Sequence, residues 1–142
     1  MILLDTNIIS ETWKPRPESS VIGWLKTQPF NSLYLCAPVL AELRFGAERL
    51  DAGLRRNLLR ASIDHLENVG YRGRILVLDG PAAGEFGRLA AKRERLGRTM
   101  GLIDAMIAAI ALTHRSVLAT RDVDGFAGLD LEIVNPFEFE AG

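Results

Sequence analysis

Four acidic residues stand in or beside apolar stretches, where an unpaired carboxylate is unusual. Asp5 directly follows an apolar run at residues 2–4, and Asp122 follows a second such run. Glu42 and Asp104 are flanked by Leu, Ala and Ile in helix-like segments. If the four carboxylates meet, they cannot all stay ionised without a cation. Oxygen ligands without His or Cys suit Mg²⁺ or Mn²⁺, and such a site is what metal-assisted phosphodiester hydrolysis requires.

Each acid also has an ordinary structural interpretation. Asp5 could cap a helix that begins at Thr6, and Asp104 could complement the dipole of its helix. Glu42 could be a solvated helix residue, and Asp122 an acid in a turn. The joint placement of the four favours a site, and the sequence contains no nucleophile elbow or Gly-rich phosphate loop that would indicate another chemistry.

Short apolar runs alternate with longer amphipathic stretches along the chain. We expect strands at residues 2–4, 33–36, 75–78, 117–119 and 132–134. Their alternation with helices predicts a mostly parallel sheet covered on both faces, an α/β sandwich. Ligands bind at the carboxyl ends of the strands in such sheets. Asp5 and Asp122 are expected at those ends.

The helices that connect these strands carry recognisable start signals. Ser19 and Ser20 are expected to cap the first long helix, and Pro38 suits the first turn of the next. An Arg-rich helix follows Gly53, and Asp79 is expected to cap the helix after it. Residues 102–112 are almost wholly apolar, which predicts a helix packed on most sides.

Length and composition predict one globular domain over residues 1–142. The chain is 48% hydrophobic, with a formal net charge of −1, which argues against binding nucleic acid through bulk positive charge. The single Cys36 cannot form an internal disulfide and is expected to be buried. The longest apolar stretch is much shorter than a membrane span and no signal segment is evident, so we expect a soluble, cytoplasmic protein.

Fourteen of the 17 basic residues are Arg, which suits contact with phosphate. One group precedes the Asp104 helix and comprises Arg88, Lys92, Arg93, Arg95 and Arg98; a second comprises Arg49, Arg55, Arg56 and Arg60. Each group could steer an RNA backbone, or could form a solvated helix face.

Several bulky and aromatic residues admit two interpretations as well. Trp13, Trp24, Phe45 and Leu50 could pack in the core or belong to a partner surface. His65 and His114 are far apart and share no ligand spacing, so we expect structural or surface residues rather than a zinc site.

The sequence resembles the PIN-domain ribonucleases, in particular the toxins of VapBC-type toxin–antitoxin pairs. The resemblance lies in residues 1–11, 41–46, 104–109 and 119–122, in that order and at the spacing of the family. The opening segment and the ending at residues 135–137 resemble the FitB-like branch.

This resemblance implies a three-layer α/β/α sandwich and a Mg²⁺- or Mn²⁺-dependent endoribonuclease. It makes Asp5, Glu42, Asp104 and Asp122 the acidic quartet, with the metal held chiefly by Asp5 and Asp104. The supporting residues that it implies are Thr6, Asn7 and Thr120, with Asp124 as a substitute for Asp122.

The partners implied by the resemblance are an RNA substrate and a small DNA-binding antitoxin, with the toxin as a homodimer or within a larger complex. The alternative is a non-enzymatic subunit of a DNA-bound repressor complex, or a metal-dependent signalling domain of receiver type. A receiver needs a Lys on a late strand, whereas Lys14, Lys26 and Lys92 lie outside the expected strands. No helix-turn-helix signal is present, so contact with operator DNA would come from the partner.

Overall fold

The computed structural model describes residues 1–141, and within them five parallel strands form one sheet in the order β3-β2-β1-β4-β5. The strands are β1 (Ile2–Leu4), β2 (Leu33–Cys36), β3 (Ile75–Leu76), β4 (Val117–Ala119) and β5 (Ile133–Val134). β1 is central: Ile2 lies opposite Leu33 of β2 and Val117 of β4. Residues that follow β1 and β4 therefore emerge next to each other at the carboxyl edge of the sheet.

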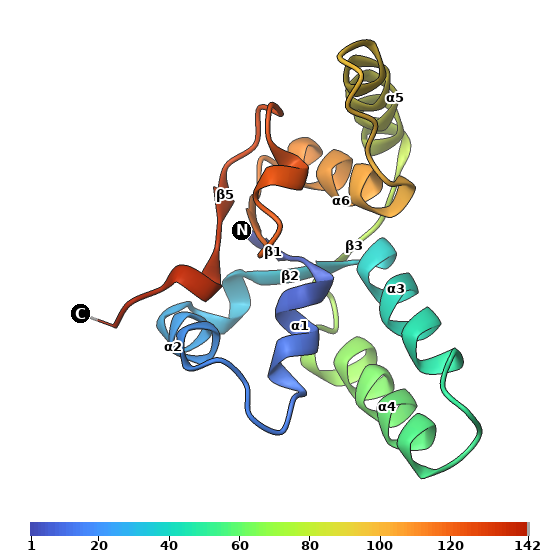
Figure 1. Cartoon of the computed structure of the whole chain (residues 1–142), viewed down its shortest axis with the longest axis vertical. Helices are drawn as coiled ribbons and strands as arrows, with labels where there is room; N and C mark the ends of the chain where they lie inside the picture. Colours follow the sequence, from blue (N-terminus) through green and yellow to red (C-terminus); the bar gives the residue numbers. More distant parts are fainter. Residues whose placement is uncertain (142) are drawn as a thin grey trace.

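Helices connect the strands and cover both faces of the sheet (Figure 1). The helices are α1 (Thr6–Thr12), α2 (Ser19–Thr27), α3 (Ala37–Glu48), α4 (Leu54–His65), α5 (Gly80–Arg95) and α6 (Leu102–Thr113). In Figure 1, α5 and α6 lie above the sheet and α1 to α4 lie below it. This arrangement confirms the expected three-layer α/β sandwich.

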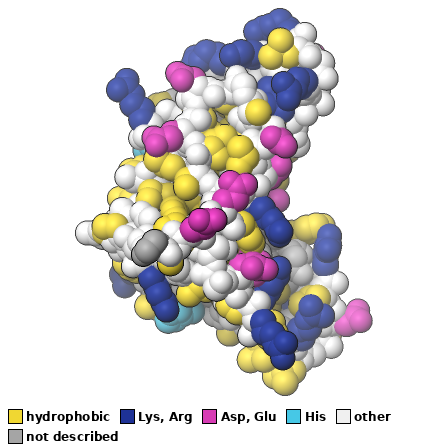
Figure 2. All heavy atoms as spheres, turned by 60° about the vertical axis from the view of Figure 1, so that its left-hand side comes forward, with side chains coloured by type: hydrophobic (Ala, Val, Ile, Leu, Met, Phe, Trp, Pro, Cys, Tyr) yellow, Lys and Arg dark blue, Asp and Glu magenta, His cyan; other side chains and the backbone are white. Residues whose placement is uncertain are grey.

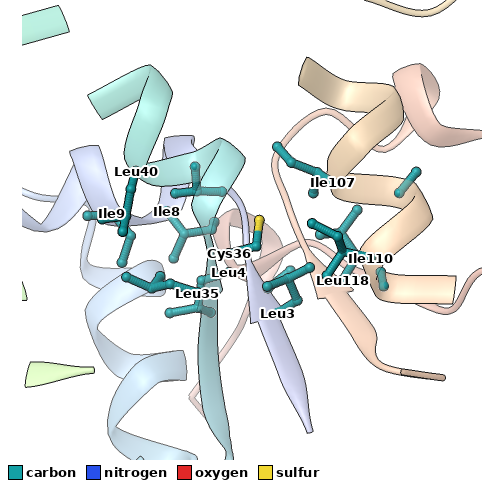
Figure 3. Packing of buried hydrophobic residues seen from close by; sticks show 14 of the residues in the cluster. Leu3, Leu4, Ile8, Ile9, Leu35, Cys36, Leu40, Ile107, Ile110 and Leu118 are labelled. Carbon is teal, nitrogen blue, oxygen red and sulfur yellow. The ribbon is translucent and has the colours of Figure 1, made fainter. Parts of the chain in front are cut away.

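The core forms where the apolar strands meet the inner faces of these helices. Figure 3 shows Leu3 and Leu4 of β1 between the side chains of α1 and β2 on one side and those of α6 and β4 on the other. Leu3, Leu4 and Ile107 have no exposed surface, and neither has Cys36, as expected. Trp24 is also buried, which places it in the core rather than on a partner surface.

Two expectations about local structure are wrong. β3 ends at Leu76, two residues early, because it is an edge strand that pairs only with β2, and Val77 is 56% exposed. Ser19 does not cap α2: it is the first residue of the helix, after Glu18, which makes no side-chain capping bond. Asp79 does cap α5, by accepting a hydrogen bond from the backbone N–H of Ala82 at 3.0 Å.

Within residues 1–141, no helix has both the length and the hydropathy that a membrane span requires.

Replacing Leu3 by Ala should lower the free energy of unfolding by about 2–5 kcal/mol, because the cavity left at the centre of the sheet can collapse only in part. Leu54→Ala is the matched control: this leucine is 74% exposed, so its effect should stay within about 0.5 kcal/mol. Urea denaturation measures both values. Equal effects of the two substitutions would contradict the position assigned to β1.

Candidate active site

The site is built on the first turn of α1, directly after β1. Asp5 is only 4% exposed and is the N-cap of α1: its Oδ1 accepts a hydrogen bond from the backbone N–H of Thr6 at 2.8 Å. Its own N–H donates to the carbonyl of Ala119 at 2.9 Å, which holds it against the end of β4. Capping and placement at the sheet edge are therefore both properties of Asp5, rather than alternatives.

The second oxygen of Asp5 is held by residues from the end of β4 and from α1. The Thr120 hydroxyl donates to Asp5 Oδ2 at 2.7 Å across 115 residues of sequence, and Asn7 Nδ2 donates to the same oxygen at 3.2 Å. Asn7 Oδ1 also accepts the backbone N–H of Arg121 at 3.1 Å. Asn7 and Thr120 thus connect Asp5 to the segment that carries Asp122.

Glu42 reaches the same site from α3. The Thr6 hydroxyl donates to Glu42 Oε1 at 2.5 Å, so Thr6 contacts Asp5 through its backbone and Glu42 through its side chain. Pro38 lies in the first turn of α3, as expected, and brings Glu42 one turn beyond the end of β2. Glu42 is half-buried.

Asp104 lies in the first turn of α6 and is also half-buried. Burial, followed by the charges of Asp5, Glu42 and Asp122, raises its pKa to about 6. The pKa of Asp5 is raised as well, chiefly by burial and further by Glu42 and Asp122, although its hydrogen bonds from Thr120 and Thr6 oppose the change. The four carboxylates therefore lie within electrostatic reach of one another.

Asp122 and Asp124 lie on the loop after β4, and both are exposed. The Asp122 backbone N–H donates to the Thr120 hydroxyl at 3.0 Å, and Asp122 Oδ1 accepts from the Gly125 N–H at 3.1 Å. Asp124 begins a short 3₁₀ helix, Asp124–Phe126. Asp122 is the acid of this loop that contributes to the raised pKa of both Asp5 and Asp104.

The donor set suits a hard divalent cation. Every donor is an oxygen, and the side chains whose charges shift the pKa of Asp104 are carboxylates. In residues 1–141, no three Asp, Glu, His or Cys side chains are close enough to enclose a metal ion by themselves. Mg²⁺ commonly keeps several water ligands and uses one or two carboxylates, so it does not require three such side chains in direct contact.

Cys36 lies behind the site and is excluded as a nucleophile. Burial, with smaller effects from Asp5 and Glu42, raises the pKa of its thiol to about 12. The thiol is therefore neutral at physiological pH, and the thiolate is the nucleophilic form.

Glu11 is a buried acid that the sequence analysis did not single out. It is 3% exposed and accepts hydrogen bonds from Lys14 Nζ at 2.9 Å and from the Glu18 backbone N–H at 3.1 Å. The hydrogen bond from Lys14 lowers its pKa. The only signal in the sequence is a Lys three residues later, which is too common to indicate a buried pair.

Arg93 corrects both interpretations offered for the basic group on α5. It is 7% exposed, so it belongs neither to a solvated helix face nor to an exposed RNA-binding face. Its guanidinium donates instead to three backbone carbonyls, those of Arg98, Gly125 and Ala127.

Other basic residues of the two groups are on the surface. Arg88 pairs with Glu85 at 2.7 Å, and Arg60 forms two hydrogen bonds with Glu48 at 2.8 and 2.6 Å. Figure 2 shows Lys and Arg side chains gathered towards the two ends of the molecule, over α5 and α4, with most acidic side chains of this face between them.

A cavity of about 530 Å³ adjoins the acids on the side of α1 and α3. Thr6 and Glu42 form part of its wall, and its apolar wall comes from Trp13, Leu43, Leu50 and Leu59. Trp13 and Leu50 are therefore available to a partner, although each is half-buried. A second cavity, of about 650 Å³, lies between α5, the end of α6 and the loop before β5, and none of the four acids lines it.

Comparison with known proteins identifies the family. The PIN domain family matches residues 2–131, and the chain belongs to that family. It is 39% identical to VapC ribonuclease Y4jK of Sinorhizobium fredii, over 97% of this chain and 99% of the relative. It is 36% identical to toxin FitB of Neisseria gonorrhoeae, over 96% of this chain and 99% of the relative.

Solved structures agree with this assignment. The chain superimposes with a TM-score of 0.90 on a chain of the FitAcB crystal structure from Neisseria gonorrhoeae, at 35% identity and covering 98% of this chain and 100% of that one. For VapBC-1 of nontypeable Haemophilus influenzae the TM-score is 0.74, at 28% identity, covering 96% of this chain and 98% of that one. The resemblance to VapBC toxins and to the FitB-like branch is thus confirmed.

The pKa of Asp104 leads to a prediction about pH. Because its folded pKa is raised to about 6, the carboxyl group contributes stability below its ordinary pKa, and this contribution is lost as the pH rises through about 6. In EDTA at pH 7, Asp104→Asn should therefore be more stable than wild type. Its free energy of unfolding should be higher by about 1 kcal/mol, after allowance for solvent screening. The difference should disappear near pH 4.

Urea denaturation between pH 4 and pH 8 measures this difference, with Asp130→Asn as the control because Asp130 is exposed and distant from the acids. A difference that does not depend on pH, or that has the opposite sign, would contradict the raised pKa of Asp104.

Proposed function

We propose that this protein is a Mg²⁺- or Mn²⁺-dependent endoribonuclease that acts as the toxin of a type II toxin–antitoxin system. The observation that carries the proposal is that four carboxylates from distant segments lie close enough to interact: after burial, the charges of Asp5, Glu42 and Asp122 contribute to raising the pKa of Asp104 to about 6. Membership of the PIN domain family and the similarity to a VapC ribonuclease support it.

In the proposed mechanism, Asp5 and Asp104 would hold the ion, and Glu42 and Asp122 would complete the site, through water or by orienting the attacking water. A bound divalent ion would polarise the phosphoryl oxygen and lower the pKa of the attacking water. Thr120, Asn7 and the Thr6 N–H orient the two oxygens of Asp5. Burial raises the pKa of the Cys36 thiol to about 12, so Cys36 is not the nucleophile in this proposal.

The alternative, a non-enzymatic subunit of a DNA-bound repressor complex, is favoured by one observation. A FitAB complex bound to a DNA fragment contains a chain on which this one superimposes with a TM-score of 0.90, at 35% identity. The two roles are compatible, because a toxin could occupy such a complex while its antitoxin contacts DNA. A receiver-type signalling domain is disfavoured by the absence of Lys from the described strands.

Loss of a residue that only supports a metal ligand costs up to about 100-fold in activity. Asp5 would bind the ion directly, so Asp5→Asn should reduce RNA cleavage by more than about 100-fold. The amide keeps the size of the side chain and one carbonyl oxygen but removes the charge that would hold the ion. The measurement is cleavage of a panel of cellular RNAs with Mn²⁺, with Mg²⁺ and with EDTA, followed by mapping of the new RNA ends.

The matched control for this experiment is Asp130→Asn, which removes one carboxylate away from the acids and should cleave like wild type. Circular dichroism shows whether the Asp5 variant is folded. Full activity of folded Asp5→Asn, in a preparation free of contaminating nuclease, would remove the assignment.

The proposed partner is a cognate antitoxin, a small DNA-binding protein. The toxin itself would be a homodimer, or part of a larger complex with that antitoxin. The apolar cavity next to Thr6 and Glu42 offers a surface for an apolar antitoxin segment. An Arg or Lys of that segment could enter among the carboxylates and neutralise the same charge as the metal ion.

If a basic antitoxin residue does so, Mn²⁺ affinity should fall at least about tenfold in the complex, the equivalent of one charge-assisted hydrogen bond. Calorimetric titration of Mn²⁺ into free and antitoxin-bound protein measures this. An antitoxin variant without the inserted basic residue is the control, and it should restore the affinity. Unchanged affinity in the wild-type complex would contradict competition at the acids.

A further inference from the structure

Arg93 makes an arrangement of contacts that the proposed mechanism does not use. It is the one basic residue that is buried within residues 1–141. Its Nε donates to the carbonyl of Arg98 at 2.7 Å, Nη1 to that of Ala127 at 2.6 Å, and Nη2 to that of Gly125 at 3.4 Å. The acceptors are backbone oxygens of two separate segments.

The first segment leads from α5 to Asp104. After α5 ends, Gly97 adopts a φ of +69° and its N–H donates to the carbonyl of Glu94, while the Arg98 N–H donates to the carbonyl of Arg93 at 2.9 Å. This is a Schellman motif. Because Arg93 Nε also donates to the Arg98 carbonyl, Arg98 is bonded to Arg93 through both of its backbone groups. Three residues later, Gly101 caps α6, whose first turn carries Asp104.

The second segment is the loop that begins with Asp122. The Asp122 carboxylate accepts the N–H of Gly125, and the carbonyls of Gly125 and Ala127 accept from Arg93. Phe126, between them, is completely buried. The turn closed by Asp122 is therefore anchored to α5 through its backbone carbonyls.

We propose that Arg93 is a positioning residue that sets the placement of Asp104 relative to Asp122. The inference rests on the proposed function, because Arg93 acts through two of the four acids. A guanidinium presents its donors in a rigid fork, whereas a lysine ammonium is a single flexible point. One Arg can therefore hold two segments in register, and Lys at this position cannot. Misplacement of catalytic groups by about 1 Å can cost about 100-fold in rate.

Arg74 provides a control with the same chemistry at the opposite end of the sheet. It precedes β3, and its guanidinium donates to three backbone carbonyls, those of Phe30, Leu33 and Gly70. Arg74→Lys removes a comparable set of bonds at the amino edge of the sheet, away from the four acids. If the contribution of Arg93 is purely structural, Arg93→Lys and Arg74→Lys should have the same kcat.

The experiment compares Arg93→Lys with Arg74→Lys in steady-state RNA cleavage with Mn²⁺, well below the melting temperature of each variant. We expect kcat to fall about 10- to 100-fold in Arg93→Lys, with KM within about twofold of wild type, because a side chain as buried as Arg93 is not available to bind RNA. Arg74→Lys should keep the wild-type kcat in its folded fraction. Equal kcat in the two variants, or a rise in KM alone, would overturn the proposal.

Two readouts do not depend on cleavage. Hydrogen exchange of the Phe126 and Ala127 amides should become faster in Arg93→Lys and not in Arg74→Lys, and Mn²⁺ affinity should fall in Arg93→Lys alone. If wild type cleaves no RNA, the proposed function fails while these readouts still test Arg93. If Arg93→Lys keeps the amide exchange rates and the Mn²⁺ affinity of the wild-type protein, the positioning role is overturned, even if the wild-type protein is an active nuclease.

Gly125→Ala tests the route through Asp122. A Cβ at residue 125 would overlap the Asp122 carboxylate, so Ala must displace that carboxylate without touching Arg93. If both substitutions act through Asp122, the double variant Arg93→Lys/Gly125→Ala should lose clearly less activity than the product of the two single losses. A loss in the double variant equal to the product of the two single losses would show that Arg93 does not act through Asp122.

Discussion

Mutual repulsion among carboxylates is the constraint on which the rest of this structure depends. A parallel sheet brings the ends of β1 and β4 together. The second turn of α3 brings Glu42 to the same place, and the first turn of α6 brings Asp104 there. Burial and three like charges raise the pKa of Asp104 to about 6. Keeping this carboxyl group ionised therefore costs free energy, which other interactions of the fold must offset. The apolar core beneath, from Leu3 to Ile107, supplies part of that offset.

The hydrogen bonds around Asp5 show how the chain holds the most buried of the four acids in place. Thr120 and the Thr6 N–H favour the ionised form of Asp5, while burial and the charges of Glu42 and Asp122 oppose it. Thr6 and Thr120 each contact two parts of the site: Thr6 joins Asp5 to Glu42, and Thr120 joins Asp5 to the Asp122 backbone. Two hydroxyl groups thus connect three of the four acidic segments.

Two arginines stabilise the two edges of the sheet in the same way. Arg74 ties three carbonyls together at the amino edge, where it also lies over the rings of Phe30 and Tyr71. Arg93 ties three carbonyls together at the carboxyl edge. Buried carbonyls need donors because unpaired polar groups are costly in the interior. At the carboxyl edge, the loops that meet this need also carry the acids, so the packing of α5 and the geometry of the site are linked.

The sequence by itself determined the strands at residues 2–4, 33–36 and 117–119, since a short apolar run that ends at a polar residue suits a strand buried on both faces. It also indicated the caps at Asp5 and Asp79, because capping depends on bonds to residues one to three positions away. It named the four acids individually, through the apolar residues beside them.

Only the tertiary structure decided the rest. The early end of β3 follows from its position at the sheet edge, and the electrostatic reach of Asp122 to Asp5 and Asp104 follows from the path of its loop. The burial of Arg93 depends on carbonyls 32 and 34 residues away. Local patterns report on neighbours along the chain, whereas pairing, burial and charge interactions are set by segments that meet only after the chain has folded.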